Sequence, residues 1–294
     1  MIYLESFNLP KDTWVDFYFS RPDDPDSWPK DLPRENEKYS ADLRTIHNSW
    51  YPWKTFYSRD LSHIDFRDVT IFYGGNASGK TTLLNVIAQK LGLQRVSLFN
   101  TSYFFDDFCA CNGGYKLADS IISLNAVRRG KILVSDDVFN SILSVRKRNL
   151  EKDIKTEELS QEYLKGPRYT NTPSMSRVIK SALGRKEEEL SNGETGFQYF
   201  LEQIPYKALV LLDEPENSLS AEWQMILSKE LYRLSTEGEC QLVIATHSPF
   251  ILSLPNAKIY DLDSVPVKTA KWHELENMRT YYQLFNAHRA EFER

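Results

Sequence analysis

The chain is poor in cysteine and contains no long apolar run. Cys109, Cys111 and Cys240 are its three cysteines in 294 residues, and their odd number and spacing suit neither a disulfide framework nor a zinc ribbon. We expect buried free thiols. No stretch of about 18 apolar residues occurs, and Glu5 interrupts the apolar N-terminus, which argues against a membrane span and a signal peptide. We therefore expect a cytoplasmic protein without a membrane partner.

The chain also lacks an excess of basic residues. Its formal net charge is −5 and 41% of its residues are hydrophobic, an ordinary globular composition. A protein coated in basic surface for nucleic acid is not expected, although a local basic patch is compatible with an acidic average. Nucleic acid therefore stays open as a partner. The sequence has no internal repeat and no low-complexity tract.

Short apolar strand patterns alternate with helical ones along the chain. This order predicts a mainly parallel sheet covered by helices, preceded by an antiparallel β region at the N-terminus in which the first two strands form a hairpin. The segments expected as strands are residues 2–7, 14–19, 69–73, 131–134, 208–212 and 241–245.

Three further stretches have other patterns. Residues 21–57 carry repeated prolines among charges and tryptophans, so we expect an irregular excursion there. Residues 138–164 and 175–190 have helical spacing and many charges, which predicts a helical subdomain. At the C-terminus, residues 276–294 predict a docking helix. Its apolar face would be formed by Met278, Tyr282, Phe285 and Phe292.

The sequence GGNASGKT, residues 74–81, matches G-x-x-x-x-G-K-[ST], the phosphate-binding loop, and lies between a predicted strand and a predicted helix. Glycines let successive backbone N–H groups turn towards an anion, and the following helix directs its positive end there. Lys80 adds a charge at the β and γ phosphates, and Thr81 offers a hydroxyl to Mg²⁺. The nucleotide-binding residues expected from this motif are Gly74, Gly75, Asn76, Ala77, Ser78, Gly79, Lys80, Thr81 and Thr82.

The sequence ALVLLDEP, residues 208–215, is an apolar strand that ends in two acids. Its end lies at the carboxyl edge of the sheet, where ligands of open α/β sheets bind. We expect Asp213 to hold Mg²⁺, with Thr81, and Glu214 to orient or deprotonate the attacking water.

Two further motifs resemble those of ATP-binding cassette (ABC) ATPases. The sequence LSNGE, residues 190–194, looks like the ABC signature, and IATHSPF puts His247 where the family has its switch histidine beside the γ phosphate. The resemblance implies that Ser191 and Gly193 contact ATP bound to a second subunit, and hence a homodimer. The signature residues could equally cap a helix, with Ser191 as N-cap and Glu194 in the first turn.

The motifs depart from the transporter pattern. Transporter cassettes follow the Glu-Pro pair with a loop ending in Leu-Asp, whereas this chain reads DEPENSLSAEW, with Glu216 after the proline and Ser220 at the aspartate position. The phrases DEPENSL and THSPFIL resemble instead the soluble ABC-type ATPases near the AAA and OLD-like families, many of which act in genome maintenance or phage defence. A transporter subunit is therefore the less favoured interpretation.

Several features stay open at this point. The family's Q-loop glutamine has no clear equivalent, and Asp136 or Asp137 could either reach the metal or cap a helix. The segment between residues 81 and 190 is too short for the long coiled coils of DNA-bridging ATPases. Basic groups at residues 128–131 and 146–148 could contact phosphates or form a solvated helical face. The aromatic side chains that could stack on adenine, or pack in the core, are Tyr51, Trp53, Phe56 and Tyr57.

The sequence thus predicts a single α/β domain over residues 1–294, a P-loop NTPase of ABC-like type. Residues 1–134 and 195–270 would form the nucleotide-binding lobe, residues 135–194 the helical lobe with the signature, and residues 271–294 the C-terminal helix. We expect ATP and Mg²⁺ as ligands, with hydrolysis driving a head-to-tail dimer coupled to an unknown process, DNA maintenance or phage defence being favoured. The alternative is an ATP-switched binding module with weak hydrolysis and a protein effector.

Overall fold

The computed structural model describes residues 1–12, 51–57, 59–102, 104–111, 113–118, 120–166, 173–185 and 192–293. The predicted strand at residues 14–19, most of the proline-rich stretch and Ser191 lie outside these ranges.

The described residues contain a six-stranded sheet in the order β5-β6-β7-β3-β8-β9. All neighbours are parallel except β9, which runs antiparallel to β8 at one edge. The three central strands are buried at every residue, as expected when helices cover both faces. The strands are β3 (Val69–Tyr73), β5 (Lys131–Val134), β6 (Leu209–Asp213), β7 (Gln241–Ala245), β8 (Lys258–Asp261) and β9 (Lys268–Ala270).

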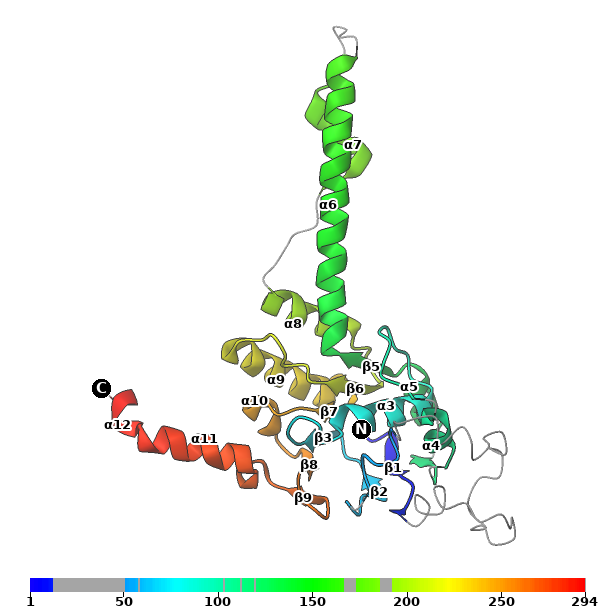
Figure 1. Ribbon diagram of the computed structural model, residues 1–294, viewed down its shortest axis with the longest axis vertical. Coiled ribbons are helices and arrows are strands. Elements are labelled where there is room, and N and C mark those ends of the chain that lie inside the picture. Colours follow the sequence, from blue (N-terminus) through cyan, green and yellow to red (C-terminus); the bar gives the residue numbers. More distant parts are fainter. Residues whose placement is uncertain are drawn as a thin grey trace.

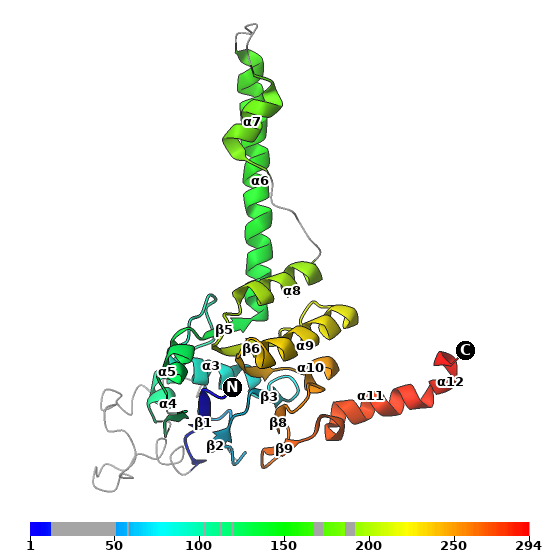
Figure 2. The same cartoon turned by 180° about the vertical axis from the view of Figure 1, so that it is seen from behind.

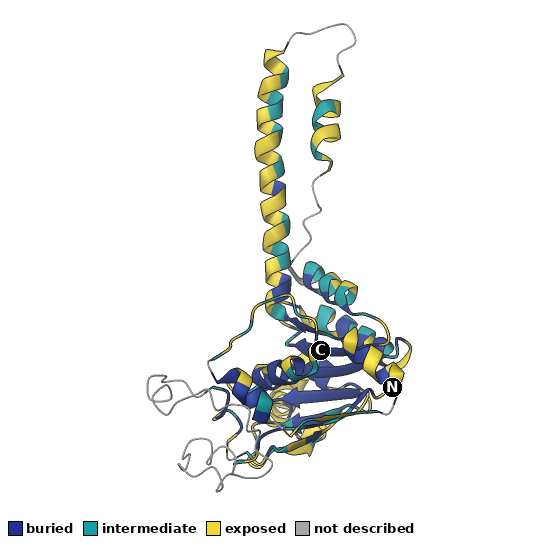
Figure 3. Ribbon diagram, turned by 90° about the vertical axis from the view of Figure 1, so that its right-hand side faces the viewer, coloured by how far each residue is buried: buried dark blue, intermediate teal, exposed yellow. Residues whose placement is uncertain are grey.

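Helices cover both faces of this sheet and make two separate cores. On one face α3 (Lys80–Leu91) contributes Leu83 and Leu84 to a core that includes Phe72. On the other face α9 (Ala221–Thr236) contributes Leu227 and Leu231 to a core that includes Ile71. Because Ile71 and Phe72 are consecutive, they point to opposite faces of β3. Figure 3 shows the buried strands between the layers of helices.

The N-terminal β region is antiparallel, as predicted, but its hairpin was predicted wrongly. Strand β1 (Leu4–Asn8) lies between β2 (His63–Asp65) and β4 (Tyr115–Leu117). Both edges of β1 are therefore occupied by strands that are distant in sequence. The Gln241 side chain joins the two sheets, since its Oε1 accepts the backbone N–H of Leu4 at 2.7 Å.

The helical subdomain forms an arm that projects from the body (Figure 1). Helix α6 (Ser135–Lys165) has 31 residues and is about 46 Å long at 1.5 Å per residue. Helix α7 (Met175–Leu183) lies alongside it, and α8 (Asn192–Gln203) packs at its base against α6 and α9. The sequence predicted the helices but did not indicate that they form an arm.

The C-terminal helices α11 (Glu276–Ala287) and α12 (Arg289–Phe292) extend away from the body in two opposite views (Figures 1 and 2). Met278 is buried, but Tyr282, Phe285 and Phe292 are 64%, 56% and 70% exposed. The predicted apolar face therefore does not dock on this chain beyond its first turn. The remaining helices are α4 (Phe105–Cys111), α5 (Ile121–Arg128), α10 (Pro249–Leu252) and the 3₁₀ helix η3 (Trp272–Glu274).

Two expectations concern the few cysteines and the missing long apolar run. Cys109, Cys111 and Cys240 are free and buried, which confirms the prediction. Within the described ranges, no helix has the length and apolar character needed to span a bilayer.

Candidate functional site

The candidate site lies where three adjacent strands end at one level of the sheet. Asp213 of β6 pairs with Ala245 of β7, and Ala245 pairs with Phe72 of β3. The segments that leave these strands are the acidic pair, the histidine loop and the glycine loop. Parallel strand order therefore brings together three motifs that are far apart in sequence.

The glycine loop is shaped by two positions that exclude a side chain. Gly79 has φ of 97°, and a Cβ there would lie 2.7 Å from Thr55 Cγ2. A Cβ on Gly74 would lie 2.5 Å from Ser78 Oγ. Glycine is thus required by the left-handed backbone at Gly79 and by close approach at Gly74. Of the other predicted loop residues, Asn76 is exposed, Ala77 has φ of 65° and Thr82 is buried in α3.

Lys80 is 5% exposed and its ammonium group is held inside the loop. Its Nζ donates to the carbonyl oxygens of Gly74 and Gly75 at 2.8 and 3.0 Å, and lies 3.5 Å from Glu214 Oε1. A buried charge is tolerated when such partners compensate for lost hydration. The lysine therefore connects the glycine loop to the acidic pair.

Thr81 and Asp213 lie within hydrogen-bonding distance across the site. The Thr81 hydroxyl donates to Asp213 Oδ1 at 3.1 Å. Burial raises the pKa of the Asp213 carboxyl to about 6, against the lowering effect of the Thr81 hydrogen bond and the Lys80 charge. A desolvated carboxylate beside a hydroxyl is the oxygen-donor set that Mg²⁺ takes in phosphoryl-transfer sites.

Glu214 follows β6 in a left-handed conformation, with φ of 47°. This region is costly for a residue with a side chain and occurs disproportionately at functional sites. Its Oε2 accepts from Asn217 Nδ2 at 3.0 Å, while its Oε1 faces Lys80 and lies 3.8 Å from His247 Nδ1. The glutamate thus lies between the predicted phosphate lysine and the predicted switch histidine.

Glu216 is a buried residue of this site to which the sequence analysis gave no role. It is 3% exposed, and its Oε1 accepts from Thr246 Oγ1 at 2.5 Å and from the N–H groups of His247 and Ser248 at 3.0 and 3.2 Å. His247 Nδ1 lies 3.6 Å from the same oxygen. An acid directly after Glu-Pro is a visible sequence signal, but its partners could not be read from sequence.

A second missed residue is Asp263, on the loop after β8. Its Oδ2 accepts the backbone N–H of Gly75 at 2.8 Å. Nearby, one Arg59 nitrogen donates to the carbonyl oxygens of Ser78 and Leu262 at 2.7 and 2.8 Å, and so ties the glycine loop to the end of β8. No sequence pattern pointed to either residue, because both contacts depend on the β3–β8 pairing.

Only part of the signature falls within the described residues. Gly193 is in the first turn of α8, and Ser191 lies outside the described residues. Because α8 begins at Asn192, Gly193 lies at a helix N-terminus. Both predicted roles of the motif, contact with a γ phosphate and capping of a helix, need this position. Helix α8 packs on α6 and α9, whereas α3 packs on the central strands and α4.

The structure decides between alternatives left open by the sequence at Asp137, Trp53 and Phe56. Asp137 is buried and its Oδ2 accepts the backbone N–H of Val134 at 3.0 Å, so it caps α6. Trp53 and Phe56 belong to the core. Ser220, at the position of the transporter aspartate, caps α9 by accepting from Trp223 N at 3.4 Å.

The residues of the glycine loop fit a bound phosphate. Ser78 is 4% exposed, and its buried Oγ finds no hydrogen-bond partner among the described residues. A buried hydroxyl without a partner is rare, and it points to a missing polar ligand. With the backbone of the loop, Lys80 and the start of α3, it forms a donor set for an anion.

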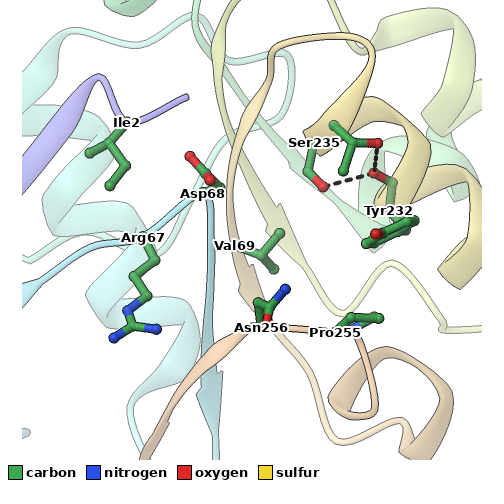
Figure 4. Close-up of a pocket in the computed structure, with 9 residues that line it drawn as sticks. Ile2, Arg67, Asp68, Val69, Tyr232, Ser235, Pro255 and Asn256 are labelled. Atoms are coloured by element: carbon green, nitrogen blue, oxygen red, sulfur yellow. Dashed lines mark hydrogen bonds between the residues drawn. The ribbon is translucent and has the colours of Figure 1, made fainter.

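A separate cavity lies at the opposite edge of the sheet. Its volume is about 280 Å³, and it opens between the start of β3, the end of α9 and the turn before β8 (Figure 4). Asp68 on its wall is paired with the N-terminal amine at 2.6 Å. This cavity contains none of the motif residues and is not the candidate site. Its lining residues are Ile2, Arg67, Asp68, Val69, Tyr232, Ser235, Thr236, Pro255 and Asn256.

The comparison with protein families bears on the same motifs. Residues 126–253, less than half of the chain, match the family model described as "AAA domain, putative AbiEii toxin, Type IV TA system". This part of the chain is similar to that AAA domain family. The match contains Asp213, Glu214 and His247 but begins after the glycine loop. The match confirms the predicted resemblance to AAA-like P-loop ATPases and supports nucleotide binding.

Solved structures similar to this chain are ATP-binding cassettes. The cassette MJ0796, in a dimeric post-hydrolysis state with ADP and Pi, is 16% identical, with 74% of this chain and 91% of that chain covered at a TM-score of 0.38. CbiO1 from Clostridium perfringens is 18% identical, with 78% and 88% covered at a TM-score of 0.36. No protein of curated function matches this chain.

Proposed function

We propose that this chain is a Mg²⁺-dependent ATPase whose glycine loop binds the triphosphate and whose Glu214 activates the attacking water. The observation that carries the proposal is the 3.1 Å hydrogen bond between Thr81 and Asp213, which are 132 positions apart. It brings the two expected Mg²⁺ ligands together, and the Lys80 ammonium lies beside Glu214 in the same site.

The residues have distinct roles in this proposal. The N–H groups of the loop, the Ser78 hydroxyl and Lys80 bind phosphate oxygens, and Thr81 and Asp213 hold the metal ion. When bound, Mg²⁺ supplies charge neutralisation at the transferring phosphoryl group. Glu214 accepts a proton from the attacking water, and His247 contacts the γ phosphate.

We further propose that two copies close head to tail, so that Ser191 and Gly193 of one copy complete the site of the other. Helix α8 has 12 residues, and its N-terminal N–H groups are suited to an anion. Figures 1 and 2 show that α8 begins at its end farther from α6. Because the helix packs on α6 and α9, its start is held outside its own glycine loop, and two-fold symmetry would make the contact reciprocal.

Mixing two inactive variants tests this composite site. Lys80→Ala damages the loop, and Gly193→Asp adds a negative charge at the signature. Each variant alone is expected to be inactive, whereas an equal mixture forms heterodimers with one intact site and recovers about a quarter of the wild-type rate. A mixture as inactive as its components, with heterodimers demonstrated by differently tagged copies, would contradict the shared site.

The process coupled to the cycle is proposed to be phage defence rather than DNA maintenance. The family description names a toxin of a toxin–antitoxin system, which supports the first of these. The second candidate function is an ATP-switched module with weak intrinsic hydrolysis and a protein effector. Asp263 favours it, because its carboxylate accepts a Gly75 N–H that the phosphate needs. Phosphate release measured with and without cell extract from infected hosts would separate the ATPase from the switched module. A weak rate that rises with the extract supports the switched module, and an unchanged rate supports the ATPase.

A further inference from the structure

We infer that Glu216 is a positioning residue that fixes the loop carrying His247 for catalysis. The inference rests on the proposed ATPase function, because a positioned histidine matters only if the site acts on a phosphate. The acid belongs neither to the phosphate loop nor to the metal ligands. Its contacts with the histidine loop, which sequence alone did not predict, carry the argument.

The first step is the geometry of the loop. Residues 246–248 join β7 to α10, and the Thr246 N–H still donates to Phe72 O of β3 at 3.2 Å. Glu216 Oε1 accepts the Thr246 hydroxyl and the N–H groups of His247 and Ser248, at 2.5, 3.0 and 3.2 Å. Three donors on one oxygen, from three consecutive residues, hold the main chain on both sides of the histidine.

The second step is electrostatic. A carboxylate that is 3% exposed persists as a charge only where hydrogen bonds and nearby cations compensate for its lost hydration. Three donors meet Oε1, the His247 imidazole lies 3.6 Å from it, and the buried Oε2 finds no hydrogen-bond partner among the described residues. With Nδ1 directed at Glu216 and Glu214, the Nε2 side of the ring is the side left for a phosphate.

The third step is the freedom of the histidine itself. Its side chain is 45% exposed, so core packing does not fix its direction. Its main chain is the part that is held, and Glu216 holds it. Removing the acid should therefore let His247 move without disturbing Lys80, Thr81 or Asp213. The substitution should then lower turnover and leave nucleotide affinity nearly unchanged.

The experiment compares Glu216→Ala with Glu216→Gln, and uses Glu237→Ala as the control because Glu237 is 72% exposed. Misplacement of a catalytic group by about 1 Å costs about 100-fold in rate, so Glu216→Ala should lower kcat about 100-fold and change the Mg·ATP dissociation constant by less than about threefold. Glu216→Gln keeps an acceptor oxygen, so its kcat should be at least about tenfold higher than that of Glu216→Ala. A kcat within about threefold of wild type for Glu216→Ala would overturn the inference.

Hydrogen exchange gives a readout that does not need activity. Glu216→Ala should speed exchange of the His247 amide at least about tenfold, while Glu216→Gln keeps most of the protection. The Ser248 amide should change less, because it also donates to Thr246 Oγ1 at 3.0 Å. The Glu214 amide, which donates to Ala245 O at 2.9 Å, is the internal control and should be unchanged. Unchanged protection of His247 would refute the inference even in a protein without measurable hydrolysis, whereas an inactive wild type would refute only the ATPase proposal.

If Glu216→Ala does not fold, Thr246→Val provides a milder variant. It removes one of the three donors to Glu216 and keeps both backbone N–H groups, although the Ser248 N–H also loses Thr246 Oγ1 as an acceptor. We expect a smaller loss of kcat, with little change in nucleotide affinity. Wild-type kcat together with wild-type exchange at His247 would count against the inference in this case.

Discussion

The strongest test of the candidate site is Glu214→Gln, which removes a charge and leaves the shape of the side chain. The glutamine carbonyl can still accept from Asn217 Nδ2, now 3.0 Å from Oε2. The φ of 47° at this position costs the same for both residues, because neither branches at Cβ. We therefore expect a folded protein that still binds Mg·ATP.

The size of the effect follows from the role of Glu214. A positioned general base contributes about 10²- to 10⁴-fold in rate, or about 2.7 to 5.4 kcal/mol at 1.36 kcal/mol per tenfold. The contact of Glu214 with Lys80, at 3.5 Å, acts on the ground state, so its loss alone should alter nucleotide affinity and not kcat. If the acid acts as the base, kcat falls by the factor above, in addition to any change in the Mg·ATP dissociation constant.

Two measurements follow the change. Phosphate release at saturating Mg·ATP gives kcat, and a sizing column run with Mg·ATP shows whether the slow variant accumulates as a dimer. Glu222→Gln is the matched control, since Glu222 lies exposed in the first turn of α9. Hydrolysis within threefold of wild type, or a loss confined to nucleotide affinity, would refute the assignment of Glu214 as the base.

Three further predictions concern the same site and the core. Lys80→Ala should abolish Mg·ATP binding in titration calorimetry, because the buried ammonium is the fixed cation of the loop; wild-type affinity would contradict the site. Asp263→Asn should tighten ATP binding about twofold to fivefold, because the carboxylate that accepts from Gly75 is repelled by phosphate; weaker binding would show that Asp263 supports the loop. Burial raises the pKa of Cys109 and Cys111 to about 12, so at pH 8 their thiolates should be about 1000-fold scarcer than in the unfolded chain, and iodoacetamide labelling should follow unfolding. Rapid labelling of the native protein would refute their burial.

The parts of the site that were predicted are those set by local sequence. A glycine loop between an apolar strand and a helix needs only residues 69–91 to define it, and the acids after β6 follow directly from the strand end. His247 was likewise placed by its position after β7. Because β3, β6 and β7 are parallel neighbours, their carboxyl ends meet at one edge of the sheet, and no further sequence signal is needed to predict this.

The parts that were missed depend on contacts between distant segments. Glu216 and His247 are 31 positions apart, and Gly75 and Asp263 are 188 apart. The N-terminal hairpin was predicted from the nearest apolar stretch, yet β1 pairs with residues 63–65 and 115–117 because Phe7 belongs to the core beneath them. Single-sequence patterns give no preference between such partners.

The three sets of contacts at the strand ends imply an order in the cycle. In the structure Lys80 binds the carbonyl oxygens of its own loop, and Asp263 binds the Gly75 N–H. A phosphate must replace both, because each uses a group that the anion needs. Glu216 and its histidine loop need no such exchange, since their donors are satisfied within this copy. Nucleotide entry should therefore rearrange the glycine loop and leave the histidine loop in place.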